Sequence, residues 1–306
     1  MIIIWFLYIN IYLNMKSNYF KNEFEEDQGA LILDKDDKYV ENFGKQWRDH
    51  VNVQIDSKNG FNISEELLEN VILEKLPYLK NKTVLEVGCG AGRFSEHIVK
   101  FAKKSVLVDL SQAIFFNVAK DNPNCTRIKA DFTKLIPDQK FDVVICRGVL
   151  QHTPKPKLSI LKLYDFVKDD GEVMFDIYPP PKVGFLSPKY IFWRPFFKNL
   201  IKYESCESFL TKHITLLLKL KRMVRKVLFN SRFLSDCVIP VYDYKGVIDL
   251  TDQQLEQWAV LDTLDGMYAL YENPMSYNKV QNLLKQNKIK LKDSSKPYNS
   301  FRTSIN

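Results

Sequence analysis

The sequence predicts an α/β fold, namely a doubly wound, mostly parallel sheet of seven strands with helices on both faces, an antiparallel last strand and a helical lid insertion. Two observations predict it. Apolar, β-branched runs recur between residues 83 and 178, and segments with a helical spacing of apolar residues alternate with them. Three prolines at 179–181 then break the chain ahead of a basic segment. The alternation of strand and helix indicates parallel strands, and the break indicates an insertion.

Composition and cysteine usage are those of an ordinary intracellular globular chain. The five cysteines are scattered and form no Cys-x-x-Cys pair, so we expect neither disulfides nor a zinc site, and a cytoplasmic protein. We divide the chain into five segments: an apolar leader or mis-assigned start (1–14), an N-terminal helical flap (15–80), a ligand-binding core (81–178), a basic helical insertion or lid (179–250) and a C-terminal completion of the core (251–306).

The first thirteen residues are strongly apolar but shorter than the roughly 20 that a membrane-spanning helix needs. They also lack the basic start and the small-residue cleavage site of a signal peptide. Three interpretations stay open: translation begins at Met15, the segment anchors the protein on a membrane surface, or it packs against the fold.

Residues 15–61 are polar and irregular, apart from an aromatic segment, Phe43-Gly44-Lys45-Gln46-Trp47. It is either a short helix that places its aromatic side chains on the core or a flap over a bound ligand, with Gln46 and Trp47 facing the site. A helix is expected from Asn62 to Leu76, with acids in its first turn and apolar residues along one side.

A glycine-spaced turn follows the first core strand. Thr83 to Val87 is a buried strand, and Gly88, Gly90 and Gly92 permit backbone conformations that a Cβ would block. Helical spacing resumes from Arg93 to Ala102. Such a turn lies at the carboxyl edge of a parallel sheet, where open α/β folds bind ligands. A dinucleotide fingerprint would need glycine where Arg93 stands, so another nucleotide-sized ligand is expected.

The next strands also end in acids. Asp109 closes Ser105–Asp109, nineteen positions after Gly90, and a carboxylate at about that spacing can accept hydrogen bonds from both hydroxyls of a ribose. Ser111 can cap the helix that follows. Asp131 and Phe132 follow the strand 126–130, where a carboxylate beside a free backbone N–H could bind adenine. Either acid could instead be a solvated residue at a strand end.

Two further strands complete the parallel part. Phe141–Cys146 is the fourth strand, and Arg147 to Pro154 form its exit loop, with Leu150-Gln151-His152-Thr153-Pro154 at the end. A helix from Pro156 to Val167 leads to the turn at Gly171 and the fifth strand, Glu172–Tyr178.

Taken in order, these motifs resemble one known family. Glu86-x-Gly88-x-Gly90-x-Gly92, Asp109, Asp131 and the loop at 150–154 are similar to class I (Rossmann-like) S-adenosylmethionine-dependent methyltransferases of the small-molecule branch, which includes ubiquinone-biosynthesis enzymes. Phe-Gly-x-Gln-Trp at 43–47 and Leu-Asp-Thr-x-Asp at 261–265 resemble bacterial methyltransferases of polysaccharide and secondary-metabolite pathways. The chain departs from that subgroup at 266–271, so the acceptor is the least determined part of the resemblance.

The resemblance implies S-adenosylmethionine as cofactor and methyl transfer to an O or N atom of a small molecule, with a saccharide or lipid-linked intermediate as the expected acceptor. His152 is the candidate base, although it could serve only to hydrogen-bond the loop or cap the next helix. Gln46, Trp47, Gln151, Asp262 and Asp265 are candidates for acceptor binding. Transfer from a sulfonium needs no metal to activate the donor, so no metal ligand is assigned. The cofactor-binding residues implied are Glu86, Gly88, Gly90, Asp109, Leu110, Asp131, Phe132 and Arg147.

The insertion carries the net charge of the chain. Between Lys198 and Arg232 there are nine Lys or Arg against two Glu, a balance of +7 that equals the total of +7. A helix is expected at 213–229, with its apolar side at Leu216, Leu217, Leu220, Val224 and Leu228. It could be a lid that packs this side, rest on an anionic membrane at its inner face, or recognise phosphate or RNA.

Nucleic acid is the least expected substrate, because 147–149 is Arg-Gly-Val where amino-methylating enzymes carry Asn/Asp-Pro-Pro-aromatic. The rival hypothesis is a cofactor-binding but catalytically silent partner that docks on a membrane-associated complex through residues 179–250. The chain is expected to end with a helix from Tyr277 to Leu284 and antiparallel strands at 289–291 and 300–304.

Overall fold

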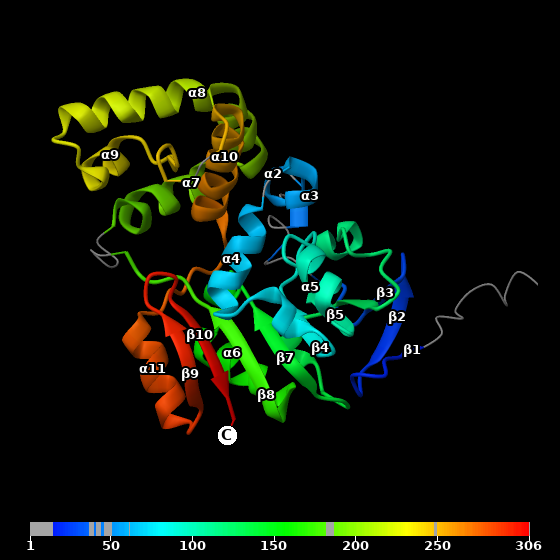
Figure 1. The fold of residues 1–306 in the computed structure, drawn as a ribbon. Coiled ribbons are helices and arrows are strands. Elements are labelled where there is room, and N and C mark those ends of the chain that lie inside the picture. Colours follow the sequence, from blue (N-terminus) through cyan, green and yellow to red (C-terminus); the bar gives the residue numbers. More distant parts are fainter. Residues whose placement is uncertain are drawn as a thin grey trace, which may run out of the picture.

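A ten-stranded sheet forms the centre of the protein in a computed structural model, which describes residues 15–36, 40, 44–45, 51–60, 62–181, 187–247 and 250–305 (Figure 1). The strand order is β1-β2-β3-β6-β5-β4-β7-β8-β10-β9. The strands are β1 (Met15–Lys16), β2 (Glu23–Asp27), β3 (Ala30–Ile32), β4 (Thr83–Val87), β5 (Lys104–Asp109), β6 (Cys125–Lys129), β7 (Phe141–Cys146), β8 (Val167–Asp176), β9 (Lys290–Ser295) and β10 (Ser300–Ser304).

The seven strands β6, β5, β4, β7, β8, β10 and β9 are the predicted sheet. Pairing is parallel from β6 through β8, and β10 is antiparallel to both β8 and β9. The predicted class, an α/β doubly wound and mostly parallel sheet, is therefore confirmed. One boundary was wrong, because β8 begins at Val167 and runs through Gly171, where we expected a turn. The strand needs glycine at position 171, because a Cβ there would lie only 2.8 Å from the Asp142 carbonyl oxygen.

Helices cover both faces of this sheet (Figure 1). Val84, Val143 and Ile145 pack under α4 (Ile63–Ile72), η1 (Leu76–Leu79) and α5 (Ser95–Phe101). Alternate residues of the same strands, such as Leu85 and Val144, face α6 (Pro156–Lys162), η5 (Leu163–Asp165) and α11 (Tyr277–Gln286). Short 3₁₀ turns follow the other strands: η2 (Gln112–Phe116), capped by Ser111, η3 (Phe132–Lys134) and η4 (Leu150–His152).

The N-terminal segment corrects one expectation. We expected a helical flap over 15–80, but residues 15–32 add three strands to the edge of the sheet, and β3 pairs parallel to β6. Gln28 and Gly29 both have positive φ and close the β2–β3 hairpin. Phe20 and Phe24 are buried in the main core. The short helices α2 (Val51–Gln54) and α3 (Asp56–Asn59) follow, whereas residues 1–14 lie outside the described part of the chain.

The insertion is helical, as predicted, and forms a unit at the carboxyl end of the sheet (Figure 1). Residues 252–268 belong to this unit rather than to the completion of the sheet, because α10 packs along α8. A capping box between Thr251 and Gln254 starts α10. The elements are η7 (Lys189–Trp193, a π-helical turn), α7 (Arg194–Leu200), α8 (Tyr203–Val227), α9 (Arg232–Val238) and α10 (Asp252–Tyr268).

The packing face of α8 differs from the predicted one. The helix begins ten positions before His213, and Leu210, Ile214 and Leu218 are its buried apolar residues. Leu216 and Leu220, which we expected to pack, are exposed. The extra turns at the start of the helix decide this, because they bring Tyr203 and Cys206 into line with Leu210 against α10.

Candidate functional site

A cavity of about 350 Å³ lies where the parallel strands end. This is the size of pocket that holds a small-molecule ligand, and the carboxyl edge is where open α/β sheets bind one. Its walls come from the turn after β4, the ends of β5 and β6, the loop after β7 and the helix α10. The cavity therefore brings together residues that are up to 225 positions apart, from Val40 to Asp265.

The glycine turn after β4 forms the floor. Gly88 has a φ of +76°, and a Cβ on it would lie 2.0 Å from Cγ2 of Val149 in the loop after β7. Gly92 has a φ of +98°, and a Cβ there would lie 2.6 Å from Oδ1 of Asn117. Any side chain at these positions would strain the backbone and displace a neighbouring loop. The turn thus places bare backbone against the cavity.

Asp109 supports this turn from the end of β5. Its Oδ2 accepts a hydrogen bond from the backbone N–H of Gly90 at 2.7 Å. Its Oδ1 accepts from the N–H and the hydroxyl of Ser111, at 2.7 and 2.6 Å. Burial raises the pKa of this carboxyl, and the hydrogen bonds partly offset the shift. The carboxylate is oriented from two sides and still lines the cavity.

Asp131 and Phe132 line the cavity after β6. Oδ1 of Asp131 accepts hydrogen bonds from the N–H and hydroxyl of Thr133, so the acid caps η3. The backbone N–H of Asp131 donates to Oδ2 of Asp34 at 2.9 Å. We expected a free backbone N–H beside this carboxylate, but the N–H of Asp131 already donates to Asp34 and is therefore not that group. Leu110 and Arg147 also line the cavity, as expected.

Two residues expected in the site lie behind it. Glu86 is 3% exposed and is absent from the lining; its Oε2 accepts a hydrogen bond from the Ser95 hydroxyl at 2.6 Å. Burial raises the pKa of Glu86 to about 7. Gln151 is also buried, and its Oε1 accepts from the backbone N–H of Tyr178 at 3.3 Å. Glu86 thus joins β4 to the start of α5, and Gln151 joins η4 to the chain after β8.

The second wall of the cavity carries acids and aromatic rings. Asp262 and Asp265 lie one turn apart on α10, near Trp258 of the same helix, Tyr178 after β8 and Tyr244. The Tyr244 hydroxyl donates a short hydrogen bond to Oδ2 of Asp262. Burial raises the pKa of Asp262 to about 6 and also raises that of Asp265. Oδ1 of Asp265 is buried and has no hydrogen-bond partner within the described residues.

His152 lies between the two walls, in the loop after β7. Its Nδ1 is 3.1 Å from the Tyr271 carbonyl oxygen. A carbonyl oxygen can only accept, so Nδ1 carries the proton, and in the neutral ring Nε2 is then the basic nitrogen. The ring also packs edge-on against Tyr178, with centroids 6.0 Å apart.

Sequence reasoning missed Arg93 and Gln54. The Arg93 guanidinium is buried at the cavity wall, where Nη1 donates to Oε1 of Gln54 at 3.1 Å and Nε donates to the Ser64 hydroxyl at 3.0 Å. Its carbon lies 5.2 Å from the Trp258 ring centroid, within reach of a cation–π contact. No local pattern predicts these contacts of Arg93. The one local signal was that Arg93 stands where a dinucleotide-binding turn would carry glycine. Gln46 and Trp47 lie outside the described residues, but Gly44 of the same segment packs against Ser111.

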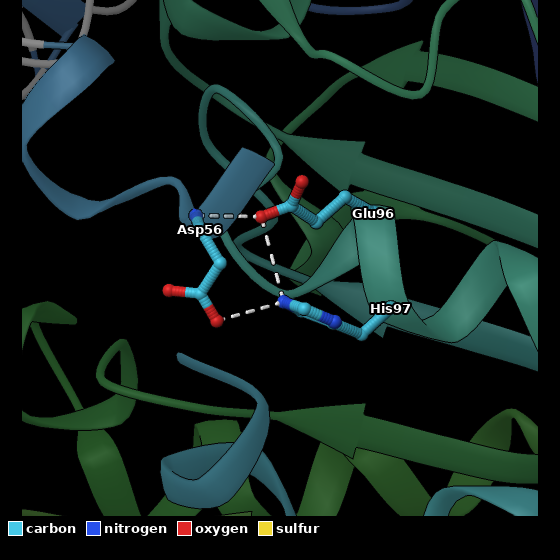
Figure 2. Close-up of side chains that lie close together, drawn as sticks. All are labelled: Asp56, Glu96 and His97. Carbon is cyan, nitrogen blue, oxygen red and sulfur yellow. Dashed lines mark hydrogen bonds and ion pairs between the residues drawn. The ribbon is translucent and has the colours of Figure 1, made fainter. Parts of the chain in front are cut away.

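A buried polar cluster fixes the chain next to Gln54 (Figure 2). Nε2 of His97 lies 3.2 Å from Oδ2 of Asp56 and 3.4 Å from Oε1 of Glu96, and Glu96 also accepts from the Asp56 backbone N–H at 2.8 Å. Asp56 in turn accepts from the N–H groups that begin α4. Burial opposes a charged ring, but the bonds to both carboxylates prevail and raise the pKa of His97 to about 9.

The three side chains could also surround a metal ion, because their ligand atoms lie within 4.8 Å of one another. Both carboxylates already accept backbone N–H groups, and the raised pKa of His97 favours an imidazolium ion in this place. We therefore treat Asp56, Glu96 and His97 as an ionic clamp that joins α3 to α5.

A family model described as a methyltransferase domain matches residues 63–198. This segment is a methyltransferase domain. It belongs to the class I, S-adenosylmethionine-dependent type, and S-adenosylmethionine is its cofactor. A ubiquinone biosynthesis O-methyltransferase of Coxiella burnetii is 32% identical over 109 residues, which are 34% of this chain and 46% of the relative. The corresponding protein of Neisseria meningitidis is 32% identical over 107 residues, or 32% of this chain and 44% of the relative.

The chain thus aligns with less than half the length of these relatives. Two solved structures also resemble the methyltransferase domain and its surroundings. Magnesium protoporphyrin IX methyltransferase from Synechocystis PCC 6803 is 14% identical with a TM-score of 0.44, over 87% of this chain and 95% of that one. A sugar N-methyltransferase from Streptoalloteichus is 18% identical with a TM-score of 0.34, over 41% of this chain and 52% of that one.

The cavity of the methyltransferase domain fits its cofactor on physical grounds. A nucleoside needs an apolar slot with a few oriented polar groups, and the walls supply Leu110 and Phe132 beside Asp109 and Asp131. A sulfonium-bearing amino acid needs close backbone approach, and Gly88 and Gly90 line the cavity without side chains.

Proposed function

We propose that the whole chain transfers a methyl group from S-adenosylmethionine to an O or N atom of a small-molecule acceptor. One observation carries this proposal: a single cavity joins the glycine turn and Asp109 on one side to His152, Asp262 and Asp265 on the other. A donor site and an acceptor site must be adjacent for direct transfer, because the reacting atoms have to be held about 3 Å apart.

The donor side is formed by the methyltransferase domain. S-adenosylmethionine supplies the methyl group and is converted to a neutral sulfide. We assign Asp109, braced by Gly90 and Ser111, to the ribose hydroxyls, because a carboxylate accepts hydrogen bonds from both. Asp131 and Phe132 are assigned to adenine, the glycine turn and Arg147 to the amino-acid end. Glu86 acts from beneath, through its bond to Ser95.

His152 is the proposed base. Its Nδ1–H is directed to the Tyr271 carbonyl oxygen, so the neutral ring presents a basic Nε2. The base removes the proton of an acceptor hydroxyl as the new bond forms, or takes the proton that an amine nitrogen releases once it is methylated, a step that contributes roughly 10² to 10⁴ in rate. The hydrogen bond to Tyr271 and the edge-on contact with Tyr178 orient this half-buried ring.

The acceptor side suits a polyhydroxylated molecule such as a saccharide, free or lipid-linked. Carboxylates accept hydrogen bonds from sugar hydroxyls, and aromatic rings pack against the apolar faces of a sugar ring. The wall offers both kinds of group, since Asp262 and Asp265 lie beside Trp258 and Tyr244. Oδ1 of Asp265 is buried and has no hydrogen-bond partner within the described residues, so it can accept a hydrogen bond from a sugar hydroxyl.

The rival function is a cofactor-binding but catalytically silent partner of a membrane-associated complex. It shares the donor site with the proposed enzyme but requires no base. Its support is the large helical unit of 187–268, whose outer surface is apolar in part.

Calorimetry with S-adenosylmethionine and a methylation assay over sugar-nucleotide and lipid-linked acceptors separate the two. We expect the wild type to bind the cofactor, and Asp109→Ala and Asp131→Ala to weaken binding at least tenfold by removing one hydrogen-bonding acid each. Lys285→Gln, exposed on α11, is the control and should bind as the wild type. Failure of the wild type to bind would refute the donor site, whereas binding without methylation of any acceptor would favour the silent partner.

A further inference from the structure

The exposed side of α8 carries a continuous apolar row. Its members lie seven, four, three and four positions apart, which is the spacing of one helical face. Their side chains are between 39% and 78% exposed, and the row extends over about 27 Å at 1.5 Å per residue. The residues of this row are Phe209, Leu216, Leu220, Met223 and Val227.

A row of cations runs beside it. Lys212, Lys219 and Lys226 are spaced by seven residues, and all three are exposed. Each lies three or four positions from members of the apolar row, so the two rows are neighbours on the helix surface. Two other cations of this stretch pair inside the protein, Lys221 with Asp236 and Arg222 with Asp243, and Nε of Arg225 donates to the Asn230 carbonyl oxygen.

We propose that this face of α8 docks on an anionic lipid bilayer. The helix would lie in the interface, with the apolar row in the outer acyl region and the lysine stems extending to lipid phosphates. Figure 1 shows α8 at the outer end of the helical unit, on the far side of α10 from the sheet. No helix of the described residues is long and apolar enough to cross a membrane. This surface is independent of the donor and acceptor cavity.

The arrangement of charges on this face argues against two other partners, a second copy of the chain and a nucleic acid. A second copy pairing through the same face would bring lysine rows together, and the acids of α8, Glu204 and Glu207, both lie near its start beside Lys45. A nucleic-acid surface would place cations at its centre to reach phosphates, whereas here the centre is apolar. A bilayer offers an apolar interior and anionic groups side by side, which matches the two rows.

Flotation of the full-length protein with vesicles tests the proposal. We expect binding to vesicles that contain phosphatidylglycerol with phosphatidylcholine, weaker binding to phosphatidylcholine alone, and loss of binding as salt rises. A Lys212→Gln, Lys219→Gln, Lys226→Gln variant should bind about 100-fold more weakly. A Leu216→Gln, Met223→Gln, Val227→Gln variant should lose binding to both kinds of vesicle.

Matched controls remove the same charge or the same apolar groups elsewhere. Lys285→Gln, Lys288→Gln, Lys290→Gln keeps the α8 cations, and Ile136→Gln, Leu158→Gln, Val247→Gln keeps the apolar row; both should bind as the wild type. Equal loss in the controls, or no binding of the wild type to phosphatidylglycerol vesicles, would overturn the proposal. So would a wild-type dimer in sedimentation that the apolar-row variant converts to monomer without any vesicle binding. Circular dichroism of each variant confirms that it is folded.

Discussion

His152 shows how a loop residue acquires a defined chemical state. The sequence places a histidine after the fourth parallel strand but does not tell which ring nitrogen bears the proton. The contact that decides it comes from Tyr271, which is 119 positions away and reaches the loop because the chain returns from α10 past the end of β8. With the proton on Nδ1, Nε2 is the basic nitrogen of the neutral ring.

Replacing His152 by Ala should lower turnover about 10²-fold or more, while the dissociation constant for S-adenosylmethionine stays within a few-fold of the wild type. The reason is that, in the proposed mechanism, the ring acts on the acceptor proton and not on the donor. Steady-state kinetics with calorimetry measure both quantities. His213→Ala, a histidine of α8 that does not line the cavity, is the control. Unchanged turnover in His152→Ala would show that the ring serves only to hold the loop.

At the level of elements, the ionic clamp of Asp56, Glu96 and His97 links two helices. The clamp joins the start of α3 to α5, and the same segment carries Gln54 to the cavity wall. Because two carboxylates share one imidazolium ion, the link depends on the protonation of His97. A change of pH should therefore loosen the N-terminal helices before it affects the sheet.

The folded-state pKa of His97, about 9, lies above the usual value near 6.5. The stabilisation is therefore complete below about pH 6.5 and is lost as pH rises through 9. Between pH 7 and 10 we expect the unfolding free energy of the wild type to fall by about 2 to 3 kcal/mol. His97→Gln should be less stable than the wild type at pH 7 but should not show this fall. Urea unfolding across this range measures it.

A second measurement applies to the wild type itself. Imidazole resonances of His97 in NMR should stay in the protonated position up to about pH 8. A neutral ring at pH 7, or a stoichiometric metal in the purified protein, would contradict the ionic clamp.

The whole molecule is one sheet with two additions, a strand edge at its N-terminal side and a helical unit over its carboxyl end. The strand edge is part of the core and not an appendage. Phe20 lies 6.0 Å from Phe166 and 6.2 Å from Phe141, ring centroid to ring centroid, under the parallel strands. Removing it should affect the folding of the entire domain.

Phe20→Ala should lower the unfolding free energy by about 3 to 5 kcal/mol, because it leaves a cavity among buried rings. Phe229→Ala is the matched control, since that ring is 94% exposed and its loss should change stability by less than about 0.5 kcal/mol. Chemical denaturation in the absence of lipid measures both. If Phe20→Ala were as stable as the control, the N-terminal strands would not belong to the cooperative core.

The sequence by itself determined the parallel core and the donor side of the cavity. Strand periodicity, the positive φ of Gly88 and Gly92, and the bonds of Asp109 to Ser111 and of Asp131 to Thr133 are local features, which a short stretch of sequence can signal. The resemblance to a known family added Asp262 and Asp265, which the structure brings into the cavity wall.

Only the tertiary structure decided the rest. Among the edge strands, β1 and β3 are too short and β2 is too acidic to show strand periodicity, and they form because β6 offers an open edge. Arg93, Tyr244 and Trp258 meet at the cavity through contacts across up to 165 positions, and the buried face of α8 was set by its packing on α10. Local patterns record what the backbone needs, whereas the choice of which side chains share a cavity depends on packing between distant elements.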